Sequence, residues 1–449
     1  MVEVRSIEEA IQQLLDEEDT RKFREHYLEM HPYDQAIFFK EQSKEKRLTI
    51  YSYLSPKEMS YIMENVEIDE AKDYITEMDP RFASMVFGEM SADDAVDILQ
   101  ILSKDEVASF LTIMEKEPAE EIKELLHYEE KTAGSIMTTE YVSFMQTETV
   151  KEVLEKMKIE APEAETIYYT YVLDDDKKLV GVLSLRNLII AEEEDTIENI
   201  MSEKVVSVAV GKDQEEIAQM MRDYDFLALP VVDFQNHLLG IITVDDILDV
   251  MDEEASDDYS KFAALTDVSI DDGKPISSAK KRLPWLVVLL FLGMFTASLI
   301  DSFEATLEEI PIVAIFIPLI AGMAGNAGTQ SLAVAVRGIA TGDYGAGKRI
   351  ILVLKELATG LLVGFSCGVV VTAMIYVWKG NLFLGMLVGF VILITLTVAT
   401  LSGSLIPLLM QKLKIDPAVA SGPFITTLND LTSILIYFGI ATTFMAYLM

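Results

Sequence analysis

Asp430 has the clearest chemical potential in this sequence, because it is the only acidic residue of the last long apolar stretch, 417–449. A carboxylate within a membrane span is costly and usually faces a partner or a water-filled path. Three residues with side-chain oxygen atoms precede it: Thr426, Thr427 and Asn429. The first of them lies one helical turn back, on the same helix face. We predict that Asp430 binds a cation and that its three neighbours line the path. The alternative is an ion pair between Asp430 and Lys355 of another apolar stretch.

A second polar group lies in the glycine-rich run PLIAGMAGNAGTQ, residues 318–330. Asn326 and Gln330 offer oxygen atoms, and Gly325 is one of the small residues that let another backbone approach closely. The alternative interpretation is a small-residue motif for helix packing. We predict that Asn326 contacts ion-bound water beside Asp430, and that Gly325 and Gln330 line the path.

The ligand chemistry of these two runs favours a hard cation. An oxygen-only lining suits Mg²⁺, which keeps much of its water and is held by one or two carboxylates. The four histidines all lie before the apolar half, and Cys367 is the only cysteine. Dedicated zinc or copper transport is therefore disfavoured, and no disulfide framework can form. The apolar half also has no HExxH motif, which argues against a membrane metalloprotease and, more generally, against an enzyme.

Acidic residues dominate the rest of the chain. Residues 283–449 contain 7 Lys and Arg and 8 Asp and Glu, so residues 1–282 hold −37 of the total formal charge of −38. Such a field disfavours nucleic acid and anionic lipid as partners and attracts cations, although acidic surface can also serve solubility alone.

The acids concentrate in two clusters, which we predict to bind regulatory cations. The first comprises Asp93, Asp94 and Asp97, and the second comprises Asp245, Asp246, Asp249, Asp252, Glu253, Asp257 and Asp258. Helical spacing places several members of each cluster on one face, and two such faces cannot approach each other without a counter-ion. The alternative is that both clusters are solvated surface.

Five apolar stretches are long enough to span a membrane as helices. They cover about 283–303, 310–336, 349–378, 382–411 and 417–449. Basic residues concentrate in the loops of one side, which by the positive-inside rule is the cytoplasm. We therefore expect the N-terminus inside and, after five spans, the C-terminus outside.

Two repeats organise the acidic part. Residues 30–103 have a 12-residue period in which an apolar or long residue precedes a cap-type residue, at 31, 43, 55, 67, 79, 91 and 103. Five of these seven are Ser or Asp, which favours a solenoid-like stack of short helices. A longer repeat relates Met137 to Met201 and Gly181 to Gly240, and each copy predicts strand, helix, strand, strand, helix.

The longer repeat resembles a tandem pair of cystathionine-β-synthase-type (CBS) domains, over about 135–256. Each copy has the [ST]-x-x-[DN] element, Ser184 to Asn187 and Thr243 to Asp246. In that family the last residue often binds a nucleotide ribose, which implies ATP or another adenine nucleotide at Asn187 or Asp246. The alternative is a helix N-cap in both copies.

The order of these parts, with the motifs GNAGTQ and PFITTLND, resembles the MgtE family of bacterial magnesium channels. The resemblance implies a helical N domain (1–132), two α/β CBS domains (133–198 and 199–254), a connecting plug helix (255–282) and an all-α five-helix pore domain (283–449). It also implies a homodimer in the bacterial inner membrane, a pore that includes Asn326 and Asp430, and closure by cytosolic magnesium. The alternatives are a CBS-regulated transporter of Mn²⁺, Co²⁺, Ca²⁺ or another solute, and a sensor that does not conduct.

Overall fold

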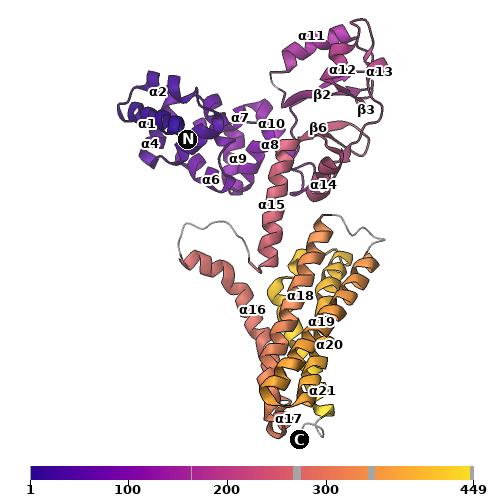
Figure 1. Ribbon diagram of the computed structural model, residues 1–449. Helices are drawn as coiled ribbons and strands as arrows, with labels where there is room; N and C mark the ends of the chain where they lie inside the picture. Colours follow the sequence, from indigo (N-terminus) through magenta and orange to yellow (C-terminus); the bar gives the residue numbers. More distant parts are fainter. Residues whose placement is uncertain (1, 163, 266–274, 342–348, 445–449) are drawn as a thin grey trace. The chain divides into compact units, whose positions relative to one another are not determined.

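The computed structural model describes residues 2–162, 164–265, 275–341 and 349–444. The chain forms two compact units, Met1–Val250 and Met251–Met449. The first contains a helical N-terminal domain and a pair of small α/β domains, and the second is helical (Figure 1). The predicted fold class is therefore confirmed.

The N-terminal domain is a stack of short helices. In order they are α1 (Val2–Asp16), α2 (Thr20–Tyr27), α3 (Pro32–Lys40), α4 (Lys44–Tyr53), α5 (Pro56–Met63), α6 (Ile68–Glu77), α7 (Pro80–Glu89), α8 (Ala92–Gln100), α9 (Lys104–Ile113) and α10 (Lys116–Leu125). All seven cap-type residues of the 12-residue period are N-caps of α3 to α9. Glu115 continues the period as the N-cap of α10.

The structural repeat of this stack is a pair of helices, 24 residues long. α3, α5, α7 and α9 pack on one another in turn, and α6 packs on α8 and α8 on α10. The caps follow the same alternation, because the side chains of His31, Ser55, Asp79 and Ser103 accept a backbone hydrogen bond, whereas those of Ser43, Glu67 and Ser91 make none. The 12-residue period is therefore half of the true repeat.

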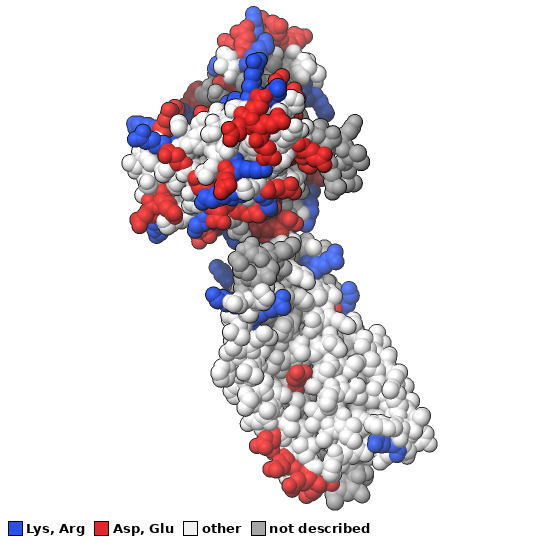
Figure 2. All heavy atoms as spheres, turned by 90° about the vertical axis from the view of Figure 1, so that its left-hand side faces the viewer, with Lys and Arg blue, Asp and Glu red and all other residues white. Residues whose placement is uncertain are grey.

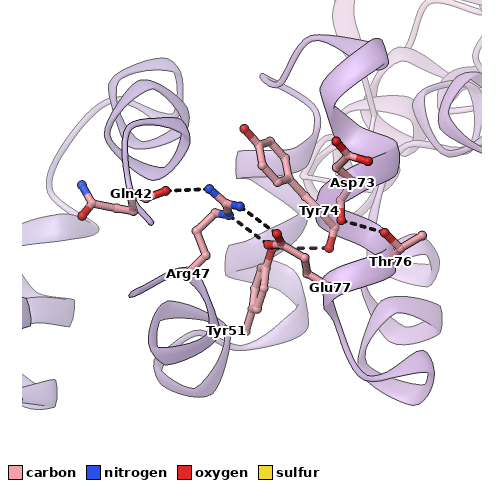
Figure 3. Close-up of polar contacts among 7 residues, drawn as sticks. All are labelled: Gln42, Arg47, Tyr51, Asp73, Tyr74, Thr76 and Glu77. Atoms are coloured by element: carbon pink, nitrogen blue, oxygen red, sulfur yellow. Dashed lines mark hydrogen bonds and ion pairs between the residues drawn. The ribbon is translucent and has the colours of Figure 1, made fainter. Parts of the chain in front are cut away.

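One largely buried ion pair joins α4 to α6 (Figure 3). The Arg47 guanidinium donates two hydrogen bonds to the Glu77 carboxylate, at 2.9 and 2.7 Å, and a third to the Gln42 carbonyl at 2.6 Å. The Tyr51 hydroxyl donates to the same carboxylate, and the guanidinium lies 4.8 Å from the centre of the Tyr74 ring. The bond from Arg47 is the main cause that lowers the pKa of Glu77.

The α/β pair has the predicted element order in both copies. The first contains β1 (Tyr141–Met145), α11 (Val150–Glu160), β2 (Thr166–Leu173), β3 (Leu179–Ser184) and α12 (Leu185–Ile190), and α13 (Ile197–Ile200) follows. The second contains β4 (Val208–Ala209), α14 (Gln214–Tyr224), β5 (Ala228–Val232), β6 (Leu238–Thr243) and α15 (Val244–Phe262). In each sheet the first two strands are parallel and the last two antiparallel.

Each CBS-like copy forms backbone hydrogen bonds with a strand of the other copy. Thr138, before the first sheet, exchanges two backbone hydrogen bonds of 2.9 Å with Ile241 of β6, and Ser202 pairs with Val182 of β3 in the same way. A Cβ on Gly240 would lie 2.6 Å from the Thr138 carbonyl oxygen, and one on Gly181 would lie 2.3 Å from Met201 Sδ. The repeated glycines therefore mark the places where each copy receives a segment from the other.

The second unit contains the predicted membrane helices. They are α16 (Pro275–Asp301), α18 (Ile317–Ala340), α19 (Arg349–Lys379), α20 (Leu382–Lys412) and α21 (Gly422–Thr443), with α17 (Glu304–Glu309), η1 (Pro311–Phe316) and η2 (Pro417–Val419) between them. Within the described residues, five helices are long and apolar enough to cross a membrane. Their surface in Figure 2 is almost free of charged side chains, which concentrate at the two ends of the bundle.

The element boundaries differ from the predicted ones at the connector. α15 continues through 254/255 without a break as far as Phe262, and α16 begins at Pro275, before the basic residues at 280–282. A helix has no reason to end at a domain boundary when its residues keep their helical preference. The predicted end of the last span, 445–449, lies outside the described residues.

Breaking the Arg47–Glu77 pair should destabilise the α4–α6 contact. Their side chains are 14% and 9% exposed, and removing one partner of such a pair costs about 3 kcal/mol or more. Arg47→Met should therefore speed hydrogen exchange of α4 and α6 amides in the full-length protein by about 100-fold. The matched control is Lys116→Met, since Lys116 and Glu120 form an exposed pair (87% and 66%) and its loss should change exchange at most a few-fold.

The same pair sets a pH dependence. Because the pKa of Glu77 is lowered in the folded state, its contribution is present above the ordinary glutamate pKa and is lost as the pH falls below it. Exchange in α4 and α6 of the parent should accelerate below about pH 4 more than in Glu77→Gln. Equal acceleration in both would contradict this role.

Candidate ion path and acidic cation sites

α18 and α21 pack antiparallel and very closely. Gly422 lies against Thr329, whereas the Tyr437 hydroxyl, near the other end of α21, donates to the Val313 carbonyl at 2.8 Å. A Cβ on Gly325 would lie 2.8 Å from Thr426 Cγ2. The small-residue packing motif considered as an alternative is therefore present in this structure, at the same helix pair that carries the predicted ion ligands.

The predicted oxygen ligands occupy two neighbouring helices. On α18, Asn326 and Gln330 are exposed and lie one turn apart on one face. On α21, Thr426, Thr427 and Asp430 are half-buried. The contact between Gly325 and Thr426 sets the register of the two helices, so Asn326 lies roughly 7 Å nearer the Gly422 end than Asp430.

Asn429 is placed differently from the other predicted lining residues. It is fully buried, and a Cβ on Gly328 would lie 1.9 Å from its Nδ2. Neither polar atom of its amide has a hydrogen-bond partner among the described residues. Asn429 is therefore inside the seam between α18 and α21, and it does not reach the surface of the single chain.

The alternative partner of Asp430 is not in contact with it. Within the described part of the chain, Asp430 forms no ion pair, and Lys355 is exposed on α19. Its neighbour Glu356 is buried and accepts a hydrogen bond of 2.8 Å from Ser331. The ion-pair interpretation therefore has no support in this structure.

A cavity of about 550 Å³ opens at the Gly422 end of α21. Its polar side chains come from Thr329, Thr426 and Thr427, and its aromatic wall comes from Tyr259 and Phe262 of α15. Phe262 also packs against the apolar residues around η2 and the start of α21. The end of α15 therefore borders the predicted threonine ligands directly.

The first acidic cluster converges with part of the second inside the first unit. The pKa of Asp93 is raised to about 8, mainly by burial and secondly by repulsion from Asp246. Burial and repulsion from Asp93 and Glu64 raise the pKa of Asp94 to about 9. Burial also raises the pKa values of Asp246 and Glu165. Asp93 Oδ1 is buried with no hydrogen-bond partner among the described residues, so this oxygen is available to a cation or to a water that a cation holds.

Two members of this convergence were missed by sequence reasoning. Glu64 caps the end of α5 and accepts a 3.3 Å hydrogen bond from the Ser91 backbone at the start of α8. Glu165 precedes β2, far from either cluster in sequence. Both residues are far in sequence from the two predicted clusters, and no local pattern connects them to these clusters.

The remaining predicted acids are more open. Asp245, Asp249, Asp252 and Glu253 are exposed, and Asp97 is half-buried. No three His, Cys, Asp or Glu side chains in the described residues are arranged to hold one metal ion together. The acids therefore form a strongly negative surface without a ready-made cage.

Asp257 and Asp258, near the end of α15, belong to a second group that includes Asp416. The pKa of Asp258 is raised mainly by burial and secondly by repulsion from Asp416. The Lys261 ammonium lies 2.7 Å from Asp416 and 3.7 Å from Asp257. Asp416 was missed because it lies alone between two apolar stretches, although the following Pro417 marks a turn there.

The two [ST]-x-x-[DN] elements act as helix caps. Ser184 accepts from the Asn187 backbone at 3.2 Å, and Asp246 accepts from the Thr243 backbone at 3.2 Å and from its hydroxyl. A cavity of about 430 Å³ in the first copy is lined by Glu140, Tyr141, Val142, Glu160 and Ala164. Asn187 is exposed and does not line it.

Family models match most of the chain. A divalent cation transporter domain matches residues 317–440, the MgtE intracellular N domain matches 30–131, and CBS domains match 133–194 and 197–253.

Relatives of full length are similar throughout. Proteins named magnesium transporter MgtE from Enterococcus faecalis and Bacillus subtilis are 50% and 40% identical, each over 96% of both chains. The crystal structure of the soluble part of a magnesium transporter covers 56% of this chain and 99% of its own, with a TM-score of 0.55 and 46% identity. The cytosolic domain of the Mg²⁺ channel MgtE in complex with ATP covers 54% of this chain and 99% of its own, with a TM-score of 0.52 and 40% identity. Because these relatives are similar over nearly their full length and the domain matches run from the helical stack to the last span, the chain belongs to the MgtE family.

Proposed function

We propose that this chain is a magnesium-selective channel or transporter of the bacterial cell membrane, closed by magnesium bound to its acidic unit. The observation that carries the proposal is Asp430, a lone carboxylate in a spanning helix whose ion-pair alternative has no contact. Thr426 and Thr427 are half-buried on the same helix, and Asn326 is exposed on the neighbouring α18. Oxygen ligands favour a hard cation over zinc or copper, and the full-length relatives are named magnesium transporters.

The acidic unit is proposed to lie in the cytoplasm and the chain to work as a homodimer. Basic residues at 280–282, 337, 349, 412 and 414 flank one end of the spans, which supports that orientation. A pore needs a second wall opposite Asn326 and Gln330, which are exposed in one chain. The apolar window of α16 also has no buried residue within the single chain. A second copy would supply both contacts.

Magnesium is proposed to close the pore through α15. Asp93, Asp94 and Asp246 cannot all be charged at close range unless a cation binds between them. α15 contains Asp246 in its first turn and ends at Phe262, next to Thr426 and Thr427. Mg²⁺ can bind through retained waters and one or two carboxylates, so it needs no complete cage. To shift the channel from mostly open to mostly closed, Mg²⁺ must bind the closed state more favourably than the open state by about 5.5 kcal/mol. Several bound ions can share this total. Asp257, Asp258 and Asp416 are the nearest acids to the pore end of α15.

An adenine nucleotide is a further proposed ligand of the CBS pair. The support is the solved cytosolic MgtE domain in complex with ATP, at 40% identity. Asn187 is exposed at the start of α12 and free to contact a ligand with its side-chain amide, while its backbone stays in the cap.

Asp430→Ala should reduce magnesium flux into liposomes at least tenfold, because the proposed ion path then loses the Asp430 carboxylate. Asp430→Asn should also lose most flux, since an amide keeps the shape without the charge. The matched control is Glu304→Ala, which removes an acid of α17 from the same unit and should conduct normally. Normal uptake by a folded, dimeric Asp430→Ala variant would sink the assignment.

Millimolar Mg²⁺ should slow protease cleavage of the acidic unit in the full-length parent, because a bound cation screens the repulsion around Asp93 and Asp94. In the double variant Asp93→Asn, Asp94→Asn the cleavage rate should be the same with Mg²⁺ and with EDTA. The charge-matched control is Asp73→Asn, Asp105→Asn, which neutralises two exposed acids and should keep the response. If the parent itself ignored Mg²⁺, the clusters would be ordinary solvated surface.

A further inference from the structure

Glu356 is a buried carboxyl group within a spanning helix, and it is not part of the proposed ion path. The residue is 6% exposed, and it lies roughly 10 Å along α19 from the start of that helix at Arg349. An ionisable side chain at such a place is costly in a bilayer and usually has a specific function. The function of Glu356 can be inferred from its hydrogen bond with Ser331.

Ser331 joins three spanning helices at one buried point. Its hydroxyl oxygen, on α18, lies 2.8 Å from Glu356 Oε2 on α19 and 2.7 Å from the Thr400 carbonyl oxygen on α20. Ser331 itself is 3% exposed. The hydroxyl group therefore shares its hydrogen bonding between α19 and α20 and ties α18 to both.

Glycines make this junction tight. A Cβ on Gly403 of α20 would lie 2.3 Å from the Gly328 carbonyl oxygen of α18, and a Cβ on Gly360 of α19 would lie 2.2 Å from Thr400 Oγ1. Backbones this close leave little room for the helices to slide past one another. Gly328 is also the residue covered by Asn429, so the junction continues into the seam with α21.

The junction fixes the rotation of the helix that carries two proposed pore residues. Ser331 directly follows Gln330 and therefore points about 100° away from it around α18. A rotation that separated Ser331 from Glu356 would turn Asn326 and Gln330 by the same angle. We propose that Glu356 is a positioning residue for ion selectivity, whose carboxyl group holds Ser331 and thereby the orientation of Asn326 and Gln330. This inference rests on the proposed ion path.

Glu356→Leu should leave the stability of the fold nearly unchanged. In Glu356→Leu, the Ser331 hydroxyl keeps the Thr400 carbonyl as its acceptor, so no buried donor is left without a partner. Leucine also removes the cost of burying a carboxyl group, which the parent chain bears. The variant is therefore expected to fold while α18 loses its tie to α19.

The test is the ratio of Mg²⁺ to Ca²⁺ flux of full-length protein in liposomes. Glu356→Leu should lower this ratio roughly 3- to 10-fold, the range that one hydrogen bond corresponds to. Glu356→Gln, whose amide can still bond to Ser331, should keep the parent ratio, as should Lys355→Leu at the exposed neighbouring position. An unchanged ratio in Glu356→Leu would overturn the inference. An equal loss in Glu356→Gln would also overturn it, because the charge rather than the hydrogen bond would then matter.

Two further variants separate this inference from the ion path. If Asn326→Ala leaves the ratio unchanged, the ion path is wrong; if it changes the ratio and Glu356→Leu does not, only the inference fails. Glu356→Leu added to the variant Asn326→Ala, Gln330→Ala should not change the ratio further, because Glu356 acts through the positions of Asn326 and Gln330. A further loss in the combined variant would contradict the inference. Should Glu356→Leu fail to fold, Ser331→Ala removes the hydrogen bonds to both Glu356 and Thr400 and should lower the ratio at least as much.

Discussion

The convergence of carboxylates in the first unit is the constraint on which the rest of the account depends. Asp93, Asp94 and Asp246 lie close enough to repel one another, and Glu64 and Glu165 add to the same field. Elsewhere in this unit an acid is stabilised by a basic partner, as Glu77 is by Arg47. The convergent acids instead hold raised pKa values, which means that their charged forms are disfavoured until a cation arrives. A mobile counter-ion is the simplest partner for such a surface.

The second unit differs, because its helices contain few charged residues. A polar side chain within a spanning helix is costly unless it has a polar partner or a function. Glycines bring α18, α19, α20 and α21 close together, and Ser331, Glu356 and Asn429 lie buried in the contacts between them. Asn326, Gln330 and Asp430 remain accessible on two of these helices. The same close packing can therefore orient the ligands of an ion and resist lipid entry.

The sequence predicted the architecture well because its signals are local. The residue types at 31, 43, 55, 67, 79, 91 and 103 are N-caps in the structure, since capping depends on a few neighbouring atoms. The pairing of helices into a 24-residue repeat was missed, because it depends on which helices touch. Asn429 was predicted as a lining residue by its neighbours, but the glycine at 328 draws its side chain into the helix seam. Glu64, Glu165 and Asp416 were missed for the same reason, since only the fold brings together acids that are far apart in sequence.

We propose that magnesium on the side of the acidic unit closes the path past Asp430. The most direct test is Mg²⁺ flux through oriented full-length protein at a fixed driving force, while free Mg²⁺ on that side is stepped from micromolar to millimolar. We expect flux to stop in the millimolar range and to return when the ion is removed. Flux that follows the driving force alone, with no dependence on Mg²⁺ at the acidic unit, would contradict it.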